Sequence, residues 1–178
     1  MKNNKLQVAV IGCGGIANQK HFPALKSQAD KCEMVAFCDI QIERAEKAAK
    51  EYGSADAKVY QDYNELLKDE NIDVVHICTP NVSHSPIAVA AFEAKKHVLC
   101  EKPMAATTED ARKMMDAWKK SGMKFTIGYQ NRFRTDAQAL KRACEEGKLG
   151  EVYFAKAHAV RRRAVPTWGV FPDKSKQG

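Results

Sequence analysis

The sequence lacks any apolar run of the roughly 20 residues that a membrane-spanning helix needs. An early apolar stretch, residues 6–11, is too short for the hydrophobic core of a secretory signal, although lysines precede it and a cysteine follows. The six cysteines show no C-x-x-C spacing, and several fall within apolar runs. These absences predict a cytoplasmic protein with reduced, buried thiols, no metal site and no membrane partner.

The net charge of +7 is also unevenly distributed along the sequence. Residues 1–125 carry 18 basic and 17 acidic side chains, whereas residues 126–178 carry 11 and 5. Three of the basic residues are consecutive, Arg161, Arg162 and Arg163. They end a strand-like segment, residues 151–163, in which alternate side chains would point to opposite faces. Only part of the cluster then shares one surface, so we expect a solvated or substrate-facing strand and no nucleic-acid partner.

A glycine cluster joins the first apolar run to a helix-compatible stretch. The letters GCGGIA follow Ile11 and form a G-x-G-x-x-A turn, which is typical of dinucleotide-binding domains. Gly12 allows a sharp turn, Gly14 lets backbone N–H groups approach a pyrophosphate, and Ala17 lets the helix pack on the strand. The diphosphate would lie at the N-terminus of that helix. Similar turns also occur in strand–helix connections that bind nothing.

A second apolar run, residues 33–38, ends at Asp39. The dinucleotide fingerprint places an acidic residue at about this position, where it accepts hydrogen bonds from the adenosine ribose. A carboxylate there repels the 2′-phosphate of NADP, so we expect NAD as the cofactor. Alternatively, Asp39 caps the helix that begins near Gln41.

Short apolar runs alternate with helix-compatible stretches along most of the chain. The expected strands are residues 5–11, 33–39, 58–60, 72–78, 97–100 and 124–128. Near-continuous apolar runs such as residues 72–78 suit strands that are covered on both faces, as in parallel sheets. The sequence therefore predicts an α/β fold, a doubly wound parallel sheet (Rossmann domain) over residues 1–128. Its ligand would lie outside the carboxyl ends of the strands.

Helix start signals support this alternation. Thr107 with Asp110 has the spacing of a capping box, and so has Asp62 three residues before a glutamate. Pro86 follows Ser85 as a proline in the first helical position follows its cap.

Three further segments would meet at the carboxyl edge of the sheet: TPNVSH at residues 79–84, EKP at 101–103 and GYQNRF at 128–133. With GCGGIA, the Asp39 strand end and a later PTWGVF, these segments resemble the Gfo/Idh/MocA family of nicotinamide-dependent oxidoreductases. The resemblance covers the whole chain. It implies an N-terminal Rossmann domain, a C-terminal α/β domain, and oxidation or reduction of a secondary alcohol or carbonyl on a sugar, cyclitol or related small molecule.

The resemblance also implies a role for individual residues. Within the turn from Gly12 to Ala17, the residues Gly14, Gly15 and Ile16 would contact the pyrophosphate. Asp39 would anchor the ribose of the adenosine.

The nicotinamide side of the cofactor would be bordered by Thr79, Pro80, Asn81 and His84. Glu101 and Lys102 would reach the nicotinamide ribose. For His84 the alternative is a helix N-terminal residue without a cofactor contact. The remaining histidines, His21, His76, His97 and His158, are expected to be structural.

Lys102 is the expected catalytic residue. A hydroxyl that gives up a hydride must also lose its proton, so a cation or a base beside the oxygen lowers the barrier. Lys102 can stabilise the developing alkoxide or, with a lowered pKa, accept the proton. The resemblance also implies a cis peptide bond between Lys102 and Pro103.

Two more cofactor contacts are expected outside the Rossmann domain. Gln130, with Tyr129 and Arg132, lies in the loop that faces the cleft in this family, although Arg132 can instead pair with a helix acid. Trp168 either edges the cofactor pocket or fills a packing gap.

The expected second domain, residues 129–178, contains only a helix near residues 136–146 and one strand. Family members continue with a glycine-rich turn and a helix whose Asp and His complete the catalytic site. We therefore expect the front portion of a longer enzyme, which forms a homo-oligomer at full length. Two other functions stay open: an NAD-using glycoside hydrolase or lyase of the same lineage, and a non-catalytic dinucleotide-binding regulator.

Overall fold

The structure is a computed structural model that describes residues 4–160, 162, 170 and 172–177. The chain divides into two units. One unit is Tyr129–Trp168, and the other comprises Met1–Gly128 together with Gly169–Gly178.

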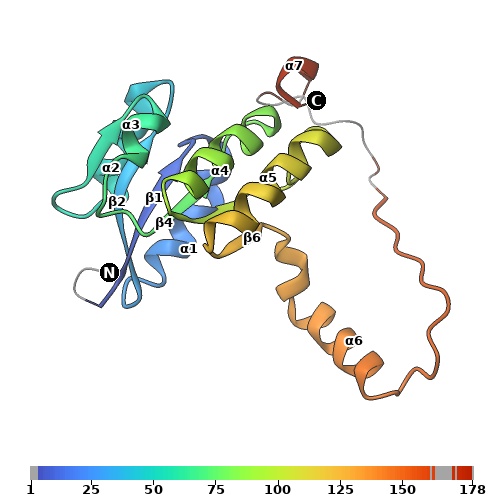
Figure 1. Cartoon of the computed structure of the whole chain (residues 1–178). Helices are drawn as coiled ribbons and strands as arrows, with labels where there is room; N and C mark the ends of the chain where they lie inside the picture. The colour runs from blue at the N-terminus through green and yellow to red at the C-terminus, as the bar shows by residue number, and fades with distance from the viewer. Residues whose placement is uncertain (1–3, 161, 163–169, 171, 178) are drawn as a thin grey trace. The chain divides into compact units, whose positions relative to one another are not determined.

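The larger unit is built on a sheet that has six parallel strands within the described residues (Figure 1). The strands are β1 (Leu6–Ile11), β2 (Cys32–Cys38), β3 (Lys58–Tyr60), β4 (Val74–Ile77), β5 (His97–Cys100) and β6 (Phe125–Ile127). Their order in the sheet is β3-β2-β1-β4-β5-β6. The order reverses between β1 and β4, which confirms the predicted doubly wound sheet. Each strand lies within its predicted range, except that β2 begins one residue earlier, at Cys32.

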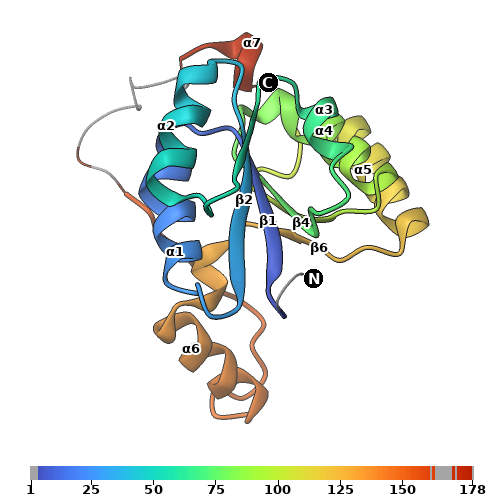
Figure 2. The same ribbon diagram turned by 90° about the vertical axis from the view of Figure 1, so that its left-hand side faces the viewer.

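Helices cover both faces of this sheet, with α1 and α2 on one face and α3, α4 and α5 on the other (Figure 2). Their bounds are α1 Phe22–Lys26, α2 Ile42–Tyr52, α3 Tyr63–Leu67, α4 His84–Glu93 and α5 Thr108–Ser121. A π-helical turn, η1 (Ala17–His21), leads into α1, and a 3₁₀ turn, η2 (Asn81–Ser83), leads into α4. A short helix, α7 (Lys174–Gln177), also belongs to this unit.

Alternate residues of the central strands enter two separate cores. Val10 of β1 packs with Phe22 and Phe37 on the α1 and α2 face. Its neighbours Ala9 and Ile11 belong to the core under α3, α4 and α5. Because both faces are covered, the strands carry apolar residues at consecutive positions, as their sequences predict.

The predicted helix starts are only partly confirmed. Thr107 accepts a hydrogen bond from the Asp110 backbone N–H at 3.1 Å, and Asp62 accepts one from Asn64 N–H at 2.8 Å. The prediction for Pro86 is wrong, because η2 leads directly into α4 at His84 and Pro86 becomes the third helical residue. Proline is tolerated there, since N–H groups in the first turn have no intrahelical partner.

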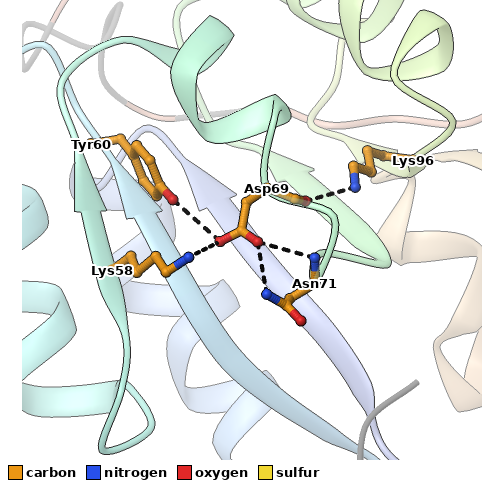
Figure 3. A network of polar contacts seen from close by, with 5 residues as sticks. All are labelled: Lys58, Tyr60, Asp69, Asn71 and Lys96. Atoms are coloured by element: carbon orange, nitrogen blue, oxygen red, sulfur yellow. Dashed lines mark hydrogen bonds and ion pairs between the residues drawn. The ribbon is translucent and has the colours of Figure 1, made fainter.

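The loop between α3 and β4 is fixed by a network around Asp69 (Figure 3). Its carboxylate accepts hydrogen bonds from Lys58 Nζ at 2.8 Å and from the Tyr60 hydroxyl at 3.3 Å. The backbone and side-chain amides of Asn71 each donate to the other oxygen at 3.0 Å. The buried Lys96 donates to the Asp69 carbonyl oxygen at 2.8 Å. Burial raises the pKa of Asp69, but Lys58 and Asn71 lower it to about 2.

The smaller unit contains η3 (Gln130–Phe133) and α6 (Thr135–Glu145), so the predicted helix is confirmed. The predicted strand is wrong in its described part, because residues 151–160 form none and are exposed. A strand needs a neighbour for its N–H and C=O groups, and the described chain offers none there. Arg161 and Arg163 lie outside the described residues. Among the described residues, no helix is long and apolar enough to cross a membrane.

Candidate dinucleotide-binding site

The glycine turn leaves β1 where the order of the strands reverses. Gly12 has a φ of +92°, and a Cβ at this position would lie 2.7 Å from the carbonyl carbon of Cys78, just after β4. Only glycine fits both this φ and this close approach of two backbones. In doubly wound sheets, the crevice beside this crossing is where ligands bind.

The next part of the turn faces open space. A Cβ built on Gly14 or Gly15 would meet no heavy atom within 4 Å. Asn18 binds the turn, because its side-chain amide donates to the carbonyl oxygens of Cys13 and Gly14 at 2.8 Å each. Ala17 is fully buried against the core, as its predicted packing role requires. The loop backbone is therefore both hydrogen-bonded to Asn18 and accessible, which suits a diphosphate approaching the first N–H groups of a helix.

Asp39 ties the end of β2 to the glycine turn. One carboxylate oxygen accepts a hydrogen bond from Cys13 N–H and the other from Gln41 N–H, both at 2.9 Å. The N-cap position of α2 is Gln41, so Asp39 binds the backbone at the start of this helix, as the alternative interpretation held in part, without occupying the cap position itself. A carboxylate oxygen accepts more than one hydrogen bond. Asp39 can therefore hold the turn and also accept from a ribose hydroxyl.

The TPN segment follows β4 and carries an unpartnered polar atom. Thr79 Oγ1 is buried and has no hydrogen-bond partner among the described residues. Buried hydroxyls are rarely left unpaired, so this atom is available to a hydrogen-bonding group that the described residues do not supply. Pro80 and Asn81 are half-buried beside it.

His84, the first residue of α4, is buried and joins two of the predicted site segments. Its Nδ1 lies 2.7 Å from the carbonyl oxygen of Pro103, and its Nε2 lies 2.9 Å from that of Thr79. His84 thus lies at a helix N-terminus, as the alternative interpretation states. Its ring also links the TPN segment to the EKP segment.

Glu101 is held on both carboxylate oxygens. Oε1 lies 3.0 Å from His21 Nε2, and Oε2 accepts from the backbone N–H of Lys102 at 3.2 Å. Burial raises the pKa of Glu101, but the hydrogen bond and charge of His21 and the N–H and charge of Lys102 bring it below its usual value. The group is therefore a carboxylate at neutral pH. Lys102 itself is exposed, and its bond to Pro103 is cis, as predicted.

Two residues that sequence reasoning assigned to structural roles lie behind Glu101. His21 Nδ1 lies 3.1 Å from His76 Nδ1, and the two rings meet edge to face. Burial, with the neighbouring charge of His21, lowers the pKa of His76 to about 3, so this ring is neutral. The only sequence signal for this pair was a histidine inside the apolar strand IDVVHIC.

Four of the cysteines lie at or just beyond the carboxyl ends of β1, β2, β4 and β5: Cys13, Cys38, Cys78 and Cys100. All four are buried free thiols, as predicted. Burial and then the charge of Asp39 raise the pKa of Cys13 and of Cys38 to about 12. Burial and the charge of Glu101 raise the pKa of the other two thiols. These side chains are therefore neutral packing groups beneath the site.

The remaining predicted contacts stay predictions. Gln130 belongs to the smaller unit, in η3. Trp168 lies outside the described residues. Within the described residues, no group of three or more His, Cys, Asp or Glu side chains is arranged to hold a metal ion.

Comparison with known proteins agrees with this geometry. A family model described as "Oxidoreductase family, NAD-binding Rossmann fold", that of the Gfo/Idh/MocA proteins, matches residues 6–129. The chain is 40% identical over 178 residues to D-glucoside 3-dehydrogenase of Escherichia coli (strain K12). The match covers 100% of this chain and 50% of that protein.

Two solved structures are also similar. The WlbA dehydrogenase from Bordetella pertussis, in complex with NADH and UDP-GlcNAcA, has a TM-score of 0.77 and 31% identity, over 84% of this chain and 44% of that one. The myo-inositol dehydrogenase from Lactobacillus casei, in complex with NAD(H) and myo-inositol, has a TM-score of 0.76 and 31% identity. The match covers 82% of this chain and 43% of that chain. The chain belongs to the Gfo/Idh/MocA oxidoreductase family. It spans about half the length of the curated relatives it matches.

Proposed function

We propose that this chain is the NAD-binding part of a dehydrogenase that transfers a hydride between nicotinamide and a secondary alcohol or carbonyl of a sugar, cyclitol or related compound. The observation that carries the proposal is the meeting of three segments at one sheet edge. The glycine turn crosses the start of the TPN segment at Gly12, Asp39 binds that turn, and His84 links Thr79 to the EKP segment. The names of the relatives support the substrate class.

The residues present fit a dinucleotide. Gly14 and Gly15 leave open space over the first helical turn, and Thr79 Oγ1 lacks a partner. Gly14, Gly15 and Ile16 would hold the pyrophosphate, with Asp39 at the adenosine ribose. The charge of Asp39 disfavours a 2′-phosphate there, so NAD is proposed over NADP.

The nicotinamide end lies with the segments after β4 and β5. Bound NAD supplies the hydride acceptor. Pro80, Asn81 and His84 would border the ring, and the Glu101 carboxylate would accept from a nicotinamide ribose hydroxyl. Lys102, exposed at the edge, would stabilise the substrate alkoxide or take its proton. Gln130 and Trp168 are proposed as further cofactor contacts.

The proposal extends to the organisation of the whole enzyme. Residues 1–128 would be the cofactor domain, and residues 129–178 would begin an α/β substrate domain. Exposed apolar side chains in this second part, among them Phe133, Leu140 and Phe154, support burial against further protein in a homo-oligomer. Free thiols at all six cysteines support a cytoplasmic location.

A binding titration tests the proposal. The 178-residue chain is titrated with NADH and with NADPH, and the binding is followed by nucleotide fluorescence. Saturable NADH binding is expected, with weaker NADPH binding. A form as long as the relatives is then assayed with sugars and cyclitols. Net reduction of NAD supports the dehydrogenase, turnover without net reduction indicates a hydrolase or lyase, and binding alone indicates a regulator.

A further inference from the structure

We propose that His21 is a positioning residue of the cofactor site: its ring orients the Glu101 carboxylate at the sheet edge, and His76 holds that ring in place. The inference rests on the proposed function, because the contact between Glu101 and the nicotinamide ribose belongs to that function. It adds two residues to the site that the motifs themselves do not contain.

The position of His21 follows from the helix after the glycine turn. His21 is the last residue of the π-helical turn η1, which begins at Ala17, directly after the glycine turn. π-helical turns inside α-helices occur frequently at functional sites. Here the turn brings a ring that is only 9% exposed against the end of β5, 80 residues further along the chain. One helix thus carries both the pyrophosphate loop and the partner of Glu101.

The Glu101 carboxylate has little freedom between its neighbours. His21 Nε2 lies 3.0 Å from Oε1, and the Lys102 N–H donates to Oε2 at 3.2 Å. On the other side, a Cβ on Gly128 would lie 3.2 Å from Oε1. Glycine at residue 128 therefore leaves just enough room for the carboxylate in this orientation.

The hydrogen bonds of the two His21 ring nitrogens explain why His76 matters for the position of the ring. An ionised Glu101 only accepts, so His21 Nε2 must carry a proton. His21 Nδ1 lies 3.1 Å from His76 Nδ1, so it accepts from His76 in a neutral His21 ring and donates to His76 in a charged one. His76 is half-buried and neutral, so its Nδ1 can take either role. Without His76, the His21 ring loses the partner of its Nδ1 atom and is held less firmly against Glu101.

Few other titratable groups near His21 contribute to the pH dependence of NADH binding. The titratable groups that face this cluster are His76 from β4, Glu101 and Lys102 after β5, and the thiols of Cys78 and Cys100, while Lys20 precedes His21 on its own helix. The two thiols have raised pKa values and stay neutral across the useful range.

The test is a double-mutant cycle on NADH affinity in the 178-residue chain. His21→Leu should weaken binding about tenfold, the scale of a lost hydrogen bond to a charged group, whereas His21→Gln keeps an N–H donor and should lose less than about threefold. In a Glu101→Gln background, His21→Leu should have almost no further effect, because it acts through the carboxylate. The same loss in both backgrounds would overturn the proposal.

A pH profile separates positioning from a general structural effect. His21 helps to hold the pKa of Glu101 below its usual value, so His21→Leu should raise it. The loss of NADH affinity on acidification should then begin at a higher pH than in the wild type. His76→Val should reproduce part of this shift, and His76→Gln, whose amide can still hydrogen-bond to His21 Nδ1, should not. An unchanged acidic limb in His21→Leu contradicts the inference.

A second variant distinguishes a local effect on the Glu101 carboxylate from misfolding of the His21 variant. Gly128→Ala leaves both histidines intact but crowds Glu101 Oε1, so it should weaken NADH binding with little change in thermal unfolding. If the wild type does not bind NADH, the proposed function fails. If it binds and neither His21→Leu nor Gly128→Ala weakens the binding, the function stands and this inference falls.

Discussion

The carboxylate of Asp39, at the end of β2, accepts a hydrogen bond of 2.9 Å from the backbone N–H of Cys13 inside the glycine turn. Two predicted elements of the cofactor site, which stand 26 residues apart, are therefore one physical unit. The bond fixes the turn before any ligand arrives. It also aims a buried negative charge at the place where the adenosine ribose is proposed to lie.

This double role makes a specific prediction for cofactor choice. Asp39→Ala should reduce the preference for NADH over NADPH, because the charge that repels a 2′-phosphate is gone. It should also weaken NADH binding, since the Cys13 N–H loses its partner. Fluorescence titrations with both nucleotides measure the ratio. Asp39→Asn is the matched variant, because its amide oxygen can still accept from the Cys13 N–H while the charge, with the second acceptor oxygen for the Gln41 N–H, is removed. Tighter binding of NADPH than of NADH by the wild type would contradict the assignment.

The glycines of the turn should respond differently to the same substitution. Gly12→Ala combines a φ of +92° with a Cβ 2.7 Å from the Cys78 backbone, so it should destabilise the fold by at least about 2 kcal/mol. Gly14→Ala enters open space and should leave the unfolding temperature almost unchanged. It should nevertheless weaken NADH binding, because the new methyl group occupies the approach of the pyrophosphate. Equal thermal stability of the two variants would show that the crossing at Gly12 is wrongly described.

The network around Asp69 predicts a pH dependence of stability (Figure 3). The pKa of Asp69 is about 2 in the folded chain, below the usual value of 3.8. A depressed pKa stabilises the fold above the unfolded value, and the stabilisation is lost as the pH falls through the folded value. Lys58 is 56% exposed, so solvent screening limits the expected contribution to about 1 kcal/mol at neutral pH.

Urea unfolding of the wild type and Asp69→Asn measures this contribution. The two should differ at neutral pH, and the difference should shrink below about pH 4. Glu65→Gln is the control, since Glu65 forms an exposed pair with Lys68 and should change little. A difference that stays constant down to about pH 3 would assign the effect of Asp69 to its neutral hydrogen bonds.

The sequence predicted the sheet and the cofactor turn because their requirements are local. Glycine at residue 12 reflects a backbone angle and a close crossing, and consecutive apolar residues in β1 reflect burial on both faces. The contact between His21 and Glu101 was not predictable in this way. It depends on the extra width of a π-helical turn and on a contact across 80 residues.

For residues 151–160, the sequence predicted a strand that the structure does not contain. The alternating pattern of this segment is compatible with a strand, but pattern alone does not supply a neighbouring strand, and the described chain places none beside it. Tyr153 is 94% exposed in this segment. A periodic pattern thus reports what a segment can form, whereas the partner decides whether it forms.

Lys102 carries the last prediction. The chain alone should bind NADH but show almost no dehydrogenase turnover, since it spans 50% of D-glucoside 3-dehydrogenase. In a form as long as the relatives, Lys102→Ala should lower kcat by about a hundredfold or more and leave NAD affinity nearly intact, because general acid–base groups contribute on that scale. Lys119→Ala, an exposed lysine on α5, is the control and should keep full activity. Robust sugar oxidation by the 178-residue chain, or a kcat unchanged by Lys102→Ala, would remove Lys102 from its catalytic role.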